Sequence, residues 1–133
     1  MLDVKISVPK YDWERHQNPD DYIGLKVVDA YFNEDADRVT VTFEGGKVIY
    51  ISDQGQCCCE HRYITCDDTF SKVIGGTWLG VEVKGVADDD GEYDVHEQAF
   101  VDLRTTFGTV TFTTHNEHNG YYGGFYLVVH EQK

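Results

Sequence analysis

The sequence has little proline, little positive charge and no long apolar run. Only two prolines occur in 133 residues, and the lack of a low-complexity tract argues against a disordered chain. No stretch is apolar for long enough to span a membrane as a helix, and residues 1–20 lack the pattern of a signal peptide. We therefore expect a folded, cytoplasmic protein with no membrane among its partners.

Positive charge is scarce because 11 Lys and Arg residues face 24 Asp and Glu residues, which gives a formal net charge of −13. A field of that sign repels nucleic-acid phosphates, so neither DNA nor RNA is expected as a partner. The charge equally favours solubility, which is its commoner meaning. Mimicry of DNA is a third interpretation, which the scattering of acidic residues between hydrophobic segments disfavours.

Apolar residues are plentiful, at 41% hydrophobic and 14% aromatic. A chain of this length can build one sizeable core, whereas two cores would each be marginal. Residues 1–21 mix charge, proline and Trp13 without periodicity, so we expect an N-terminal arm with a short strand at residues 4–8. Residues 22–133 are expected to form a single β-rich domain.

The clearest strand pattern lies at residues 38–43, where apolar and polar side chains alternate strictly. Gly45-Gly46 follows, and paired glycines supply the positive φ angles of a tight hairpin turn. With apolar segments at residues 25–32 and 47–51 on either side, the pattern predicts a three-stranded antiparallel meander. The apolar face of its middle strand consists of Val39, Val41 and Phe43.

The second half of the chain predicts one short helix and four further strands. An aspartate cap would start the helix at residues 69–74, and Gly75-Gly76 would end it. Residues 87–91 read as an acidic loop, and Asn119-Gly120 is a strong hairpin signal. The strands are expected at residues 77–86, 93–105, 109–115 and 121–130. The whole predicts a mainly β (α+β) fold of about seven mostly antiparallel strands and one short helix.

Cysteine is concentrated at residues 57–59, directly before Glu60 and His61, with Cys66 shortly after. In a cytoplasmic protein these are expected to be reduced thiols. Zinc is one interpretation, but neighbouring cysteines on an extended chain point to opposite faces, and the spacing lacks two separated ligand pairs. Small buried hydrophobic side chains are the simpler reading, so we expect neither a metal nor a cofactor. A zinc site would also need His96, His115 or His118 from elsewhere in the chain.

Catalysis is not indicated. No cysteine is placed beside a glycine-rich turn or a helix N-terminus that would stabilise its thiolate, and no carboxylate pair stands out among 24 for acid–base work. The sequence also lacks a P-loop and the GxGxxG and GxSxG motifs. We therefore expect a protein that binds rather than an enzyme.

The segment from His115 to Tyr122 is the second polar cluster. His115 and His118 could chelate a metal, although we expect them to be solvated at a loop tip. Cross-strand packing is the favoured interpretation of Tyr121 and Tyr122 taken singly, and stacking against an adenine-type base is the alternative. Any bound phosphate would have to rely on the few arginines of the chain, which are Arg15, Arg38, Arg62 and Arg104.

At these two clusters the chain resembles a family of small tailed-phage proteins known as a domain of unknown function. The shared pattern covers residues 22–130 and begins at Ile23-Gly24-Leu25-Lys26-Val27. Its later motifs appear as Cys58-Cys59-Glu60, Tyr63-Ile64, Asp67-Asp68, Ile74-Gly75 and Asn119-Gly120-Tyr121-Tyr122.

The family is similar to the Thoeris anti-defence sponges, phage proteins that sequester nucleotide signals of bacterial immunity. This resemblance implies a non-enzymatic homo-oligomer in the host cytoplasm that binds a cyclic ADP-ribose type molecule or a cyclic oligonucleotide. Asn119, Tyr121 and Tyr122 would then line the base-binding part of the pocket, and Arg104 or Arg62 would meet the pyrophosphate. The alternative is an acidic protein-interaction module that inhibits a host factor.

Overall fold

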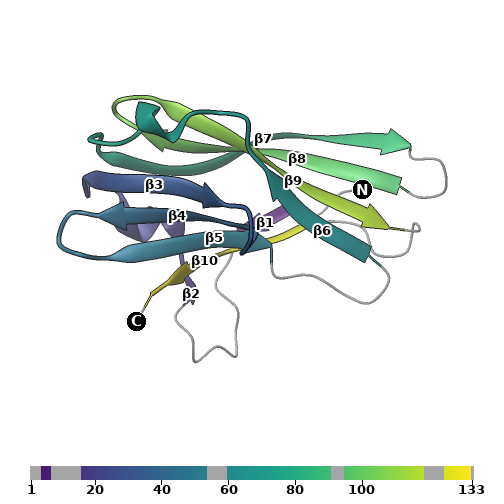
Figure 1. Cartoon of the computed structure of the whole chain (residues 1–133), viewed down its shortest axis with the longest axis horizontal. Coiled ribbons are helices and arrows are strands. Elements are labelled where there is room, and N and C mark those ends of the chain that lie inside the picture. Colours follow the sequence, from purple (N-terminus) through teal and green to yellow (C-terminus); the bar gives the residue numbers. More distant parts are fainter. Residues whose placement is uncertain (1–3, 7–15, 54–59, 91–94, 119–124, 133) are drawn as a thin grey trace.

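Two sheets face each other and enclose the core of the protein (Figure 1). The computed structural model describes residues 4–6, 16–53, 60–90, 95–118 and 125–132. Within these ranges only the backbone is described for residues 4–6, 16–17, 60, 85–90, 95, 118 and 126. The mainly β fold expected from the sequence is confirmed.

One sheet has six strands. Its order along the main path is β1 (Val4–Ile6), β10 (Phe125–Glu131), β5 (Val48–Asp53), β4 (Arg38–Phe43) and β3 (Val27–Asn33), and β2 (His16–Gln17) also pairs with β10. β1 runs parallel to β10, and the other pairs are antiparallel. The predicted meander is therefore β3–β4–β5.

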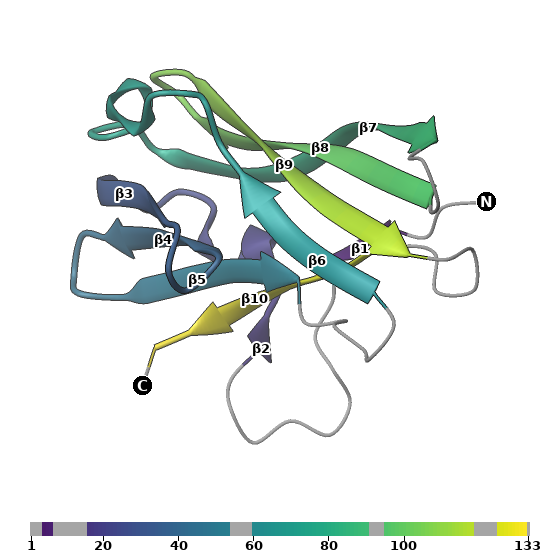
Figure 2. The same ribbon diagram turned by 45° about the vertical axis from the view of Figure 1, so that its right-hand side comes forward.

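The second sheet has four antiparallel strands. Their order is β6 (Glu60–Thr65), β9 (Thr109–His118), β8 (Val95–Thr105) and β7 (Trp78–Asp90). Figure 2 shows β6 running beside β9 along one edge of this sheet. The chain therefore passes from the first sheet to the second between β5 and β6, and returns between β9 and β10.

The core forms where the apolar faces of the two sheets meet. Residues Val39, Val41 and Phe43 are fully buried, which confirms the face that their alternation predicted. Phe43 stacks on Tyr22 at 5.2 Å between ring centroids and meets the Trp78 ring edge-on at 5.4 Å. From the four-stranded sheet the core receives Trp78, Val101, Leu103, Val110 and Phe112.

Backbone hydrogen bonds tie the two sheets together at one end. The amide of Val27, at the start of β3, donates to the Gly76 carbonyl at 2.9 Å, and the Gly75 amide donates to the Val27 carbonyl at 2.7 Å. Gly75 has a φ of 94°, a conformation that glycine adopts without strain. The indole of Trp78 also donates to the Pro19 carbonyl at 2.8 Å, which anchors the 3-10 turn Pro19–Tyr22 to the core.

The predicted glycine hairpin is confirmed. Gly45 and Gly46 both have positive φ angles, 98° and 96°, and the Gly46 amide donates to the Phe43 carbonyl at 3.0 Å. The predicted helix at residues 69–74 is wrong in kind, because the chain forms only a 3-10 turn, Phe70–Lys72. None of the helical turns in the described ranges is long and apolar enough to cross a membrane.

Two further expectations are corrected. Residues 87–90 continue β7 instead of forming an acidic loop, because an extended β8 pairs with them as far as Asp90. β9 and β10 belong to different sheets and do not pair with each other, contrary to the expected pairing of residues 109–115 with residues 121–130, and Asn119-Gly120 itself lies outside the described residues. The expected number of about seven strands agrees with the longer strands of the described residues, which form ten in all, because β1 and β2 are only three and two residues long.

Candidate functional site

Several strand ends meet at one end of the sandwich. Glu60, the first residue of β6, pairs with His118, the last of β9, and His118 also pairs with Val95 at the start of β8. In the facing sheet, Asp53 at the end of β5 pairs with Leu127 near the start of β10. The cysteine segment before β6 and the predicted turn after β9 are therefore attached to strand ends that lie close together.

The predicted base-binding residues Asn119, Tyr121 and Tyr122 lie outside the described residues, as do the cysteines at residues 57–59. The described strand β9 ends directly before this predicted turn, and β6 begins directly after the cysteines. The described part of the candidate site therefore consists of side chains on β6, β8 and β9.

Arg62 is buried in an ion pair with Asp53. Its Nη1 donates to both carboxylate oxygens, at 3.2 and 3.0 Å, and the side chains are 8% and 3% exposed. The pair joins β6 of one sheet to β5 of the other. A ligand phosphate could use this guanidinium only by competing with a carboxylate that already binds it.

Arg104 lies far from Arg62. Arg104 pairs with Thr109 at the start of β9, whereas Arg62 pairs with Asn116 near its end. At about 3.3 Å per residue these positions are about 23 Å apart along the strand. Arg104 is exposed and its Nη1 lies 3.2 Å from Oε2 of Glu82 on β7. The structure therefore does not bring the two predicted arginines together.

Four rings form a row on the outer face of β6, β9 and β8, and we call them the ring row. The Tyr63 ring stacks on His115 with 4.4 Å between centroids and 5° between planes. His61 lies 4.8 Å from Tyr63, and His96 lies 5.1 Å from His115. Cross-strand register explains the row, because Tyr63 is directly opposite His115 and His96 pairs with Glu117, two residues beyond His115.

Hydrogen bonds fix the inner rings of the row. His115 bonds through Nδ1 to Nε2 of His96 at 2.9 Å, and through Nε2 to the Thr65 hydroxyl at 2.8 Å. The Tyr63 hydroxyl donates to Glu117 Oε2 at 2.5 Å. Since a neutral imidazole has one donor and one acceptor nitrogen, His115 can satisfy both contacts without carrying a charge.

The surroundings shift two pKa values in the row. Burial lowers the pKa of His115 from its ordinary value, and the neighbouring His96 lowers it further. Burial, together with the hydrogen bond to Glu117, raises the pKa of Tyr63 to about 12. Both shifts favour the neutral forms, so at neutral pH the two inner rings, Tyr63 and His115, are uncharged.

Sequence reasoning misplaced His115, which was expected to be solvated at a loop tip. It lies in β9 and is 8% exposed. The alternation of residues 109–113 continues through His115 and Glu117, and extending the strand along that pattern would have placed both side chains on one face. Nothing in the local sequence indicates that His96 and Tyr63 meet His115, because those contacts depend on strand pairing.

A metal site was one interpretation of the cysteine and histidine clusters in the sequence. Within the ranges that the structure describes, no group of three or more His, Cys, Asp or Glu side chains is arranged to hold a metal ion. His96 and His115 hydrogen-bond to each other, and this bond occupies one ring nitrogen of each histidine that would otherwise bind a metal.

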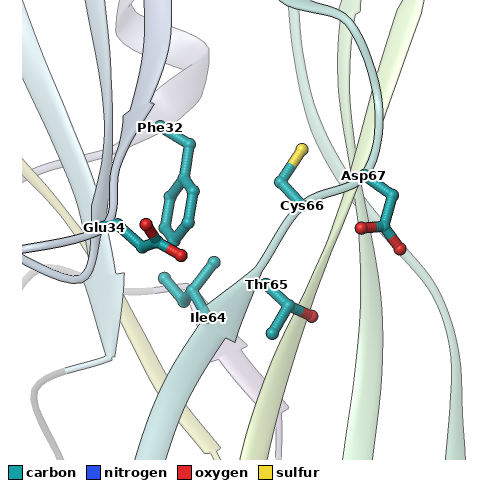
Figure 3. Close-up of a pocket in the computed structure, with 6 residues that line it drawn as sticks. All are labelled: Phe32, Glu34, Ile64, Thr65, Cys66 and Asp67. Atoms are coloured by element: carbon teal, nitrogen blue, oxygen red, sulfur yellow. The ribbon is translucent and has the colours of Figure 1, made fainter.

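A separate cleft of about 370 Å³ opens between the end of β3 and the end of β6 (Figure 3). Phe32 and Ile64 give it an apolar wall, and the Glu34 carboxylate lies beside them. The Thr65 and Asp67 side chains line the opposite side of the chain and point away from Phe32. The cleft therefore combines an apolar wall at Phe32 and Ile64 with polar lining residues, among them the Glu34 carboxylate.

Cys66 also lines this cleft, with its thiol directed into it. The thiol forms no disulfide within the described part of the chain and donates to the Thr111 carbonyl at 3.6 Å. Burial raises the pKa of Cys66 from its ordinary value. A protonated thiol of this kind is a poor nucleophile.

The chain matches the family model described as "Domain of unknown function (DUF7448)" over residues 20–128, and it belongs to that family. Comparison with curated proteins found no match, and comparison with solved structures found none. The match agrees with a small domain family of unknown function. The comparisons give no support to a similarity with the Thoeris anti-defence sponges.

Proposed function

We propose that this DUF7448 protein is a phage-type binding protein that captures a small nucleotide-derived immune signal without altering it. The observation that carries the proposal is the ring row, which lies at the end of the sandwich from which residues 119–124 continue. The ligand classes follow from the sponge resemblance: a cyclic ADP-ribose type molecule or a cyclic oligonucleotide. A homo-oligomer in the host cytoplasm is part of the same proposal.

The ring row supports base recognition. His61 is exposed at the end of the row and Tyr63 is partly exposed beside it. Stacking of a base on an aromatic side chain is worth about 1–3 kcal/mol. In this proposal Asn119, Tyr121 and Tyr122 add an amide and two phenols from the segment that follows β9.

Imidazoles are better placed than arginines to meet the anionic part of the ligand. Arg62 and Arg104 are both engaged with carboxylates, of Asp53 and Glu82. An imidazole can donate from a neutral N–H and can gain a proton when an anion approaches. The proposed site therefore needs no unpaired guanidinium, and Arg104, at the opposite end of β9, is not part of it.

The raised pKa values favour binding without chemistry. Covalent catalysis needs a nucleophile that is activated by a lowered pKa or by an adjacent base. Burial raises the pKa of both Tyr63 and Cys66, so each holds its proton at neutral pH. These two side chains are therefore suited to packing and hydrogen bonding, and the bound signal would be released intact.

Native mass spectrometry with a cyclic ADP-ribose type nucleotide and with a cyclic dinucleotide tests the proposal. We expect a stoichiometric complex on an oligomer, and the unchanged nucleotide after heat denaturation. His61→Ala should weaken binding about tenfold through the lost stacking. The control is His130→Ala, on β10, where the ring instead meets Tyr50 at 6.3 Å.

Three outcomes would contradict the proposal. A hydrolysed nucleotide would indicate an enzyme, and equal losses in the two histidine variants would place the ligand elsewhere. If neither nucleotide binds and a pull-down returns a single basic host protein, the alternative of an acidic interaction module is favoured.

A further inference from the structure

We propose that the cleft between β3 and β6 binds an arginine side chain carried by an extended segment of a partner protein. The apolar wall of the cleft and the ring row lie on opposite faces of the sheet: Phe32, Ile64 and Cys66 line the cleft, whereas Tyr63 and His115 lie on the outer face. Thr65 is shared, because it lines the cleft and hydrogen-bonds to His115. This inference does not depend on nucleotide capture.

The shape of the cleft selects a long side chain. Its volume of about 370 Å³ is near the lower end of the range for small-molecule pockets. Phe32 and Ile64 offer an apolar wall for an aliphatic stem, and the exposed Glu34 carboxylate stands at the mouth for a charged head. Long basic side chains bury their stems and keep their heads in water in this way.

Charge selects a basic occupant. The chain carries a formal charge of −13, and Glu34 and Asp67 are the ionisable carboxylates that line the cleft. Within the described part of the chain, no basic side chain forms an ion pair with Glu34. The field of the whole protein therefore attracts cationic segments, and the cleft holds a carboxylate ready to pair with one.

Arginine suits the cleft better than lysine does. A planar guanidinium can stack on the Phe32 ring and donate two parallel hydrogen bonds to the Glu34 carboxylate, whereas an ammonium is a compact and strongly hydrated charge. The protein already stacks a guanidinium on an aromatic ring elsewhere, because the Arg38 guanidinium lies 3.8 Å from the centre of the Tyr50 ring.

The edges of the two sheets decide how the segment approaches. Among the described strands, β3 and β6 are both edge strands, each paired on one side only, and a free edge can accept an added strand. On β6, however, the Ile64 amide already donates to Asp37 Oδ1 at 2.7 Å. The β3–β4 turn thus blocks strand addition at Ile64, and the open part of the cleft admits a side chain.

Titration of the full-length protein with the peptide acetyl-Ala-Ala-Arg-Ala-Ala-amide, followed by NMR, tests this inference. We expect millimolar binding with shifts at Phe32, Ile64 and Cys66. The same peptide with citrulline, which is neutral and nearly isosteric, should bind about fivefold more weakly. The lysine peptide should bind more weakly than the arginine peptide.

Two matched variants locate the interaction. Glu34→Gln should weaken binding of the arginine peptide about three- to fivefold, as expected for an exposed ion pair worth up to about 1 kcal/mol. Asp35→Asn removes the same charge from the next residue, which does not line the cleft, and should change the affinity less than about twofold.

Equal effects of the two variants would reduce the interaction to general attraction by an acidic protein and overturn the inference. So would an absence of shifts at the three cleft residues, or binding of the citrulline peptide as tight as that of the arginine peptide.

Discussion

Arg62 of β6 and Asp53 of β5 connect the two sheets through an ion pair in which one guanidinium nitrogen meets both carboxylate oxygens, at 3.2 and 3.0 Å. The side chains are 8% and 3% exposed. Buried pairs of this kind contribute modestly as a whole, but each partner left alone becomes a buried charge. The pair is therefore a structural connection first, and its effect on stability is measurable.

Asp53→Ala should lower the free energy of unfolding by about 3 kcal/mol, because it leaves the Arg62 guanidinium buried without that carboxylate. Urea denaturation followed by tryptophan fluorescence measures the change. Arg104→Gln is the control: its pair with Glu82 is 48% exposed on both sides, so the loss should stay below about 1 kcal/mol. Comparable losses in both variants would mean that burial does not distinguish the two pairs.

The stability of the protein should fall as the pH drops below about 6.5, through His115. Its pKa is lowered in the folded state, chiefly by burial, so the unfolded chain takes up this proton first. The stabilising contribution is complete above the unfolded pKa and is lost progressively as the pH falls towards the folded pKa. Urea denaturation at a series of pH values between 8 and 5 measures the slope.

The control for this dependence is His115→Gln, which cannot titrate and can still hydrogen-bond to Thr65 and His96. Its stability should depend less on pH over the same range. If the variant and the parent protein show the same slope, His115 is not the group responsible.

Substitutions of Asp37, in the β3–β4 turn, distinguish the cost of backbone strain from the cost of a lost hydrogen bond. Asp37 has a φ of 54° and accepts a hydrogen bond from the Ile64 amide. Burial raises its pKa, so its ionised form is disfavoured. Asp37→Asn keeps the acceptor and tolerates the positive φ, so it should leave stability unchanged or increase it at neutral pH. Asp37→Ala loses the acceptor and adds backbone strain, and should cost about 1–3 kcal/mol.

Asp37→Gly should fall between these two variants in thermal denaturation, since glycine relieves the strain without restoring the hydrogen bond. If the glycine and alanine variants are equally unstable, strain contributes nothing at this position.

Gly76 is required by a close approach between β7 and β8. A Cβ at this position would lie 2.6 Å from Thr105 Oγ1 and 2.9 Å from Thr105 Cβ. The Thr105 hydroxyl also accepts from the Phe107 amide at 3.2 Å, so it is not free to rotate away. Gly76→Ala should therefore cost about 1–3 kcal/mol by overpacking.

Combining Gly76→Ala with Thr105→Ala removes the closest contact, so the two losses should be less than additive in denaturant unfolding. Additive losses would show that Thr105 does not cause the crowding at Gly76.

Short-range sequence patterns correctly predicted the elements whose structure depends only on residues close together in the chain. The alternation at residues 38–43 predicted a buried face, and Val39, Val41 and Phe43 are all fully buried. Gly45 and Gly46 predicted a hairpin by their conformational freedom, and both adopt positive φ. By contrast, the glycines at residues 75–76 suggested the end of a helix, whereas they hydrogen-bond to Val27 of the other sheet.

The candidate site was predicted only in part. The sequence pointed to the segments around residues 57–63 and 115–122, and the described strands that flank them do end close together. It did not indicate that His61, Tyr63, His115 and His96 form one row, or that Arg62 and Arg104 lie at opposite ends of β9. Those relationships depend on register, and a pattern of two-residue period leaves the partner strand unspecified.

The sequence by itself determined a mainly β chain, the buried face of the central meander and an acidic surface, because alternation, turn chemistry and net charge are properties of short segments and of composition. The tertiary structure alone decided that β9 and β10 enter different sheets, that Arg62 is paired with Asp53, and that a cleft opens between β3 and β6. The physical reason is that sheet partners and register are chosen by the packing of two apolar faces, which brings together residues far apart in the chain.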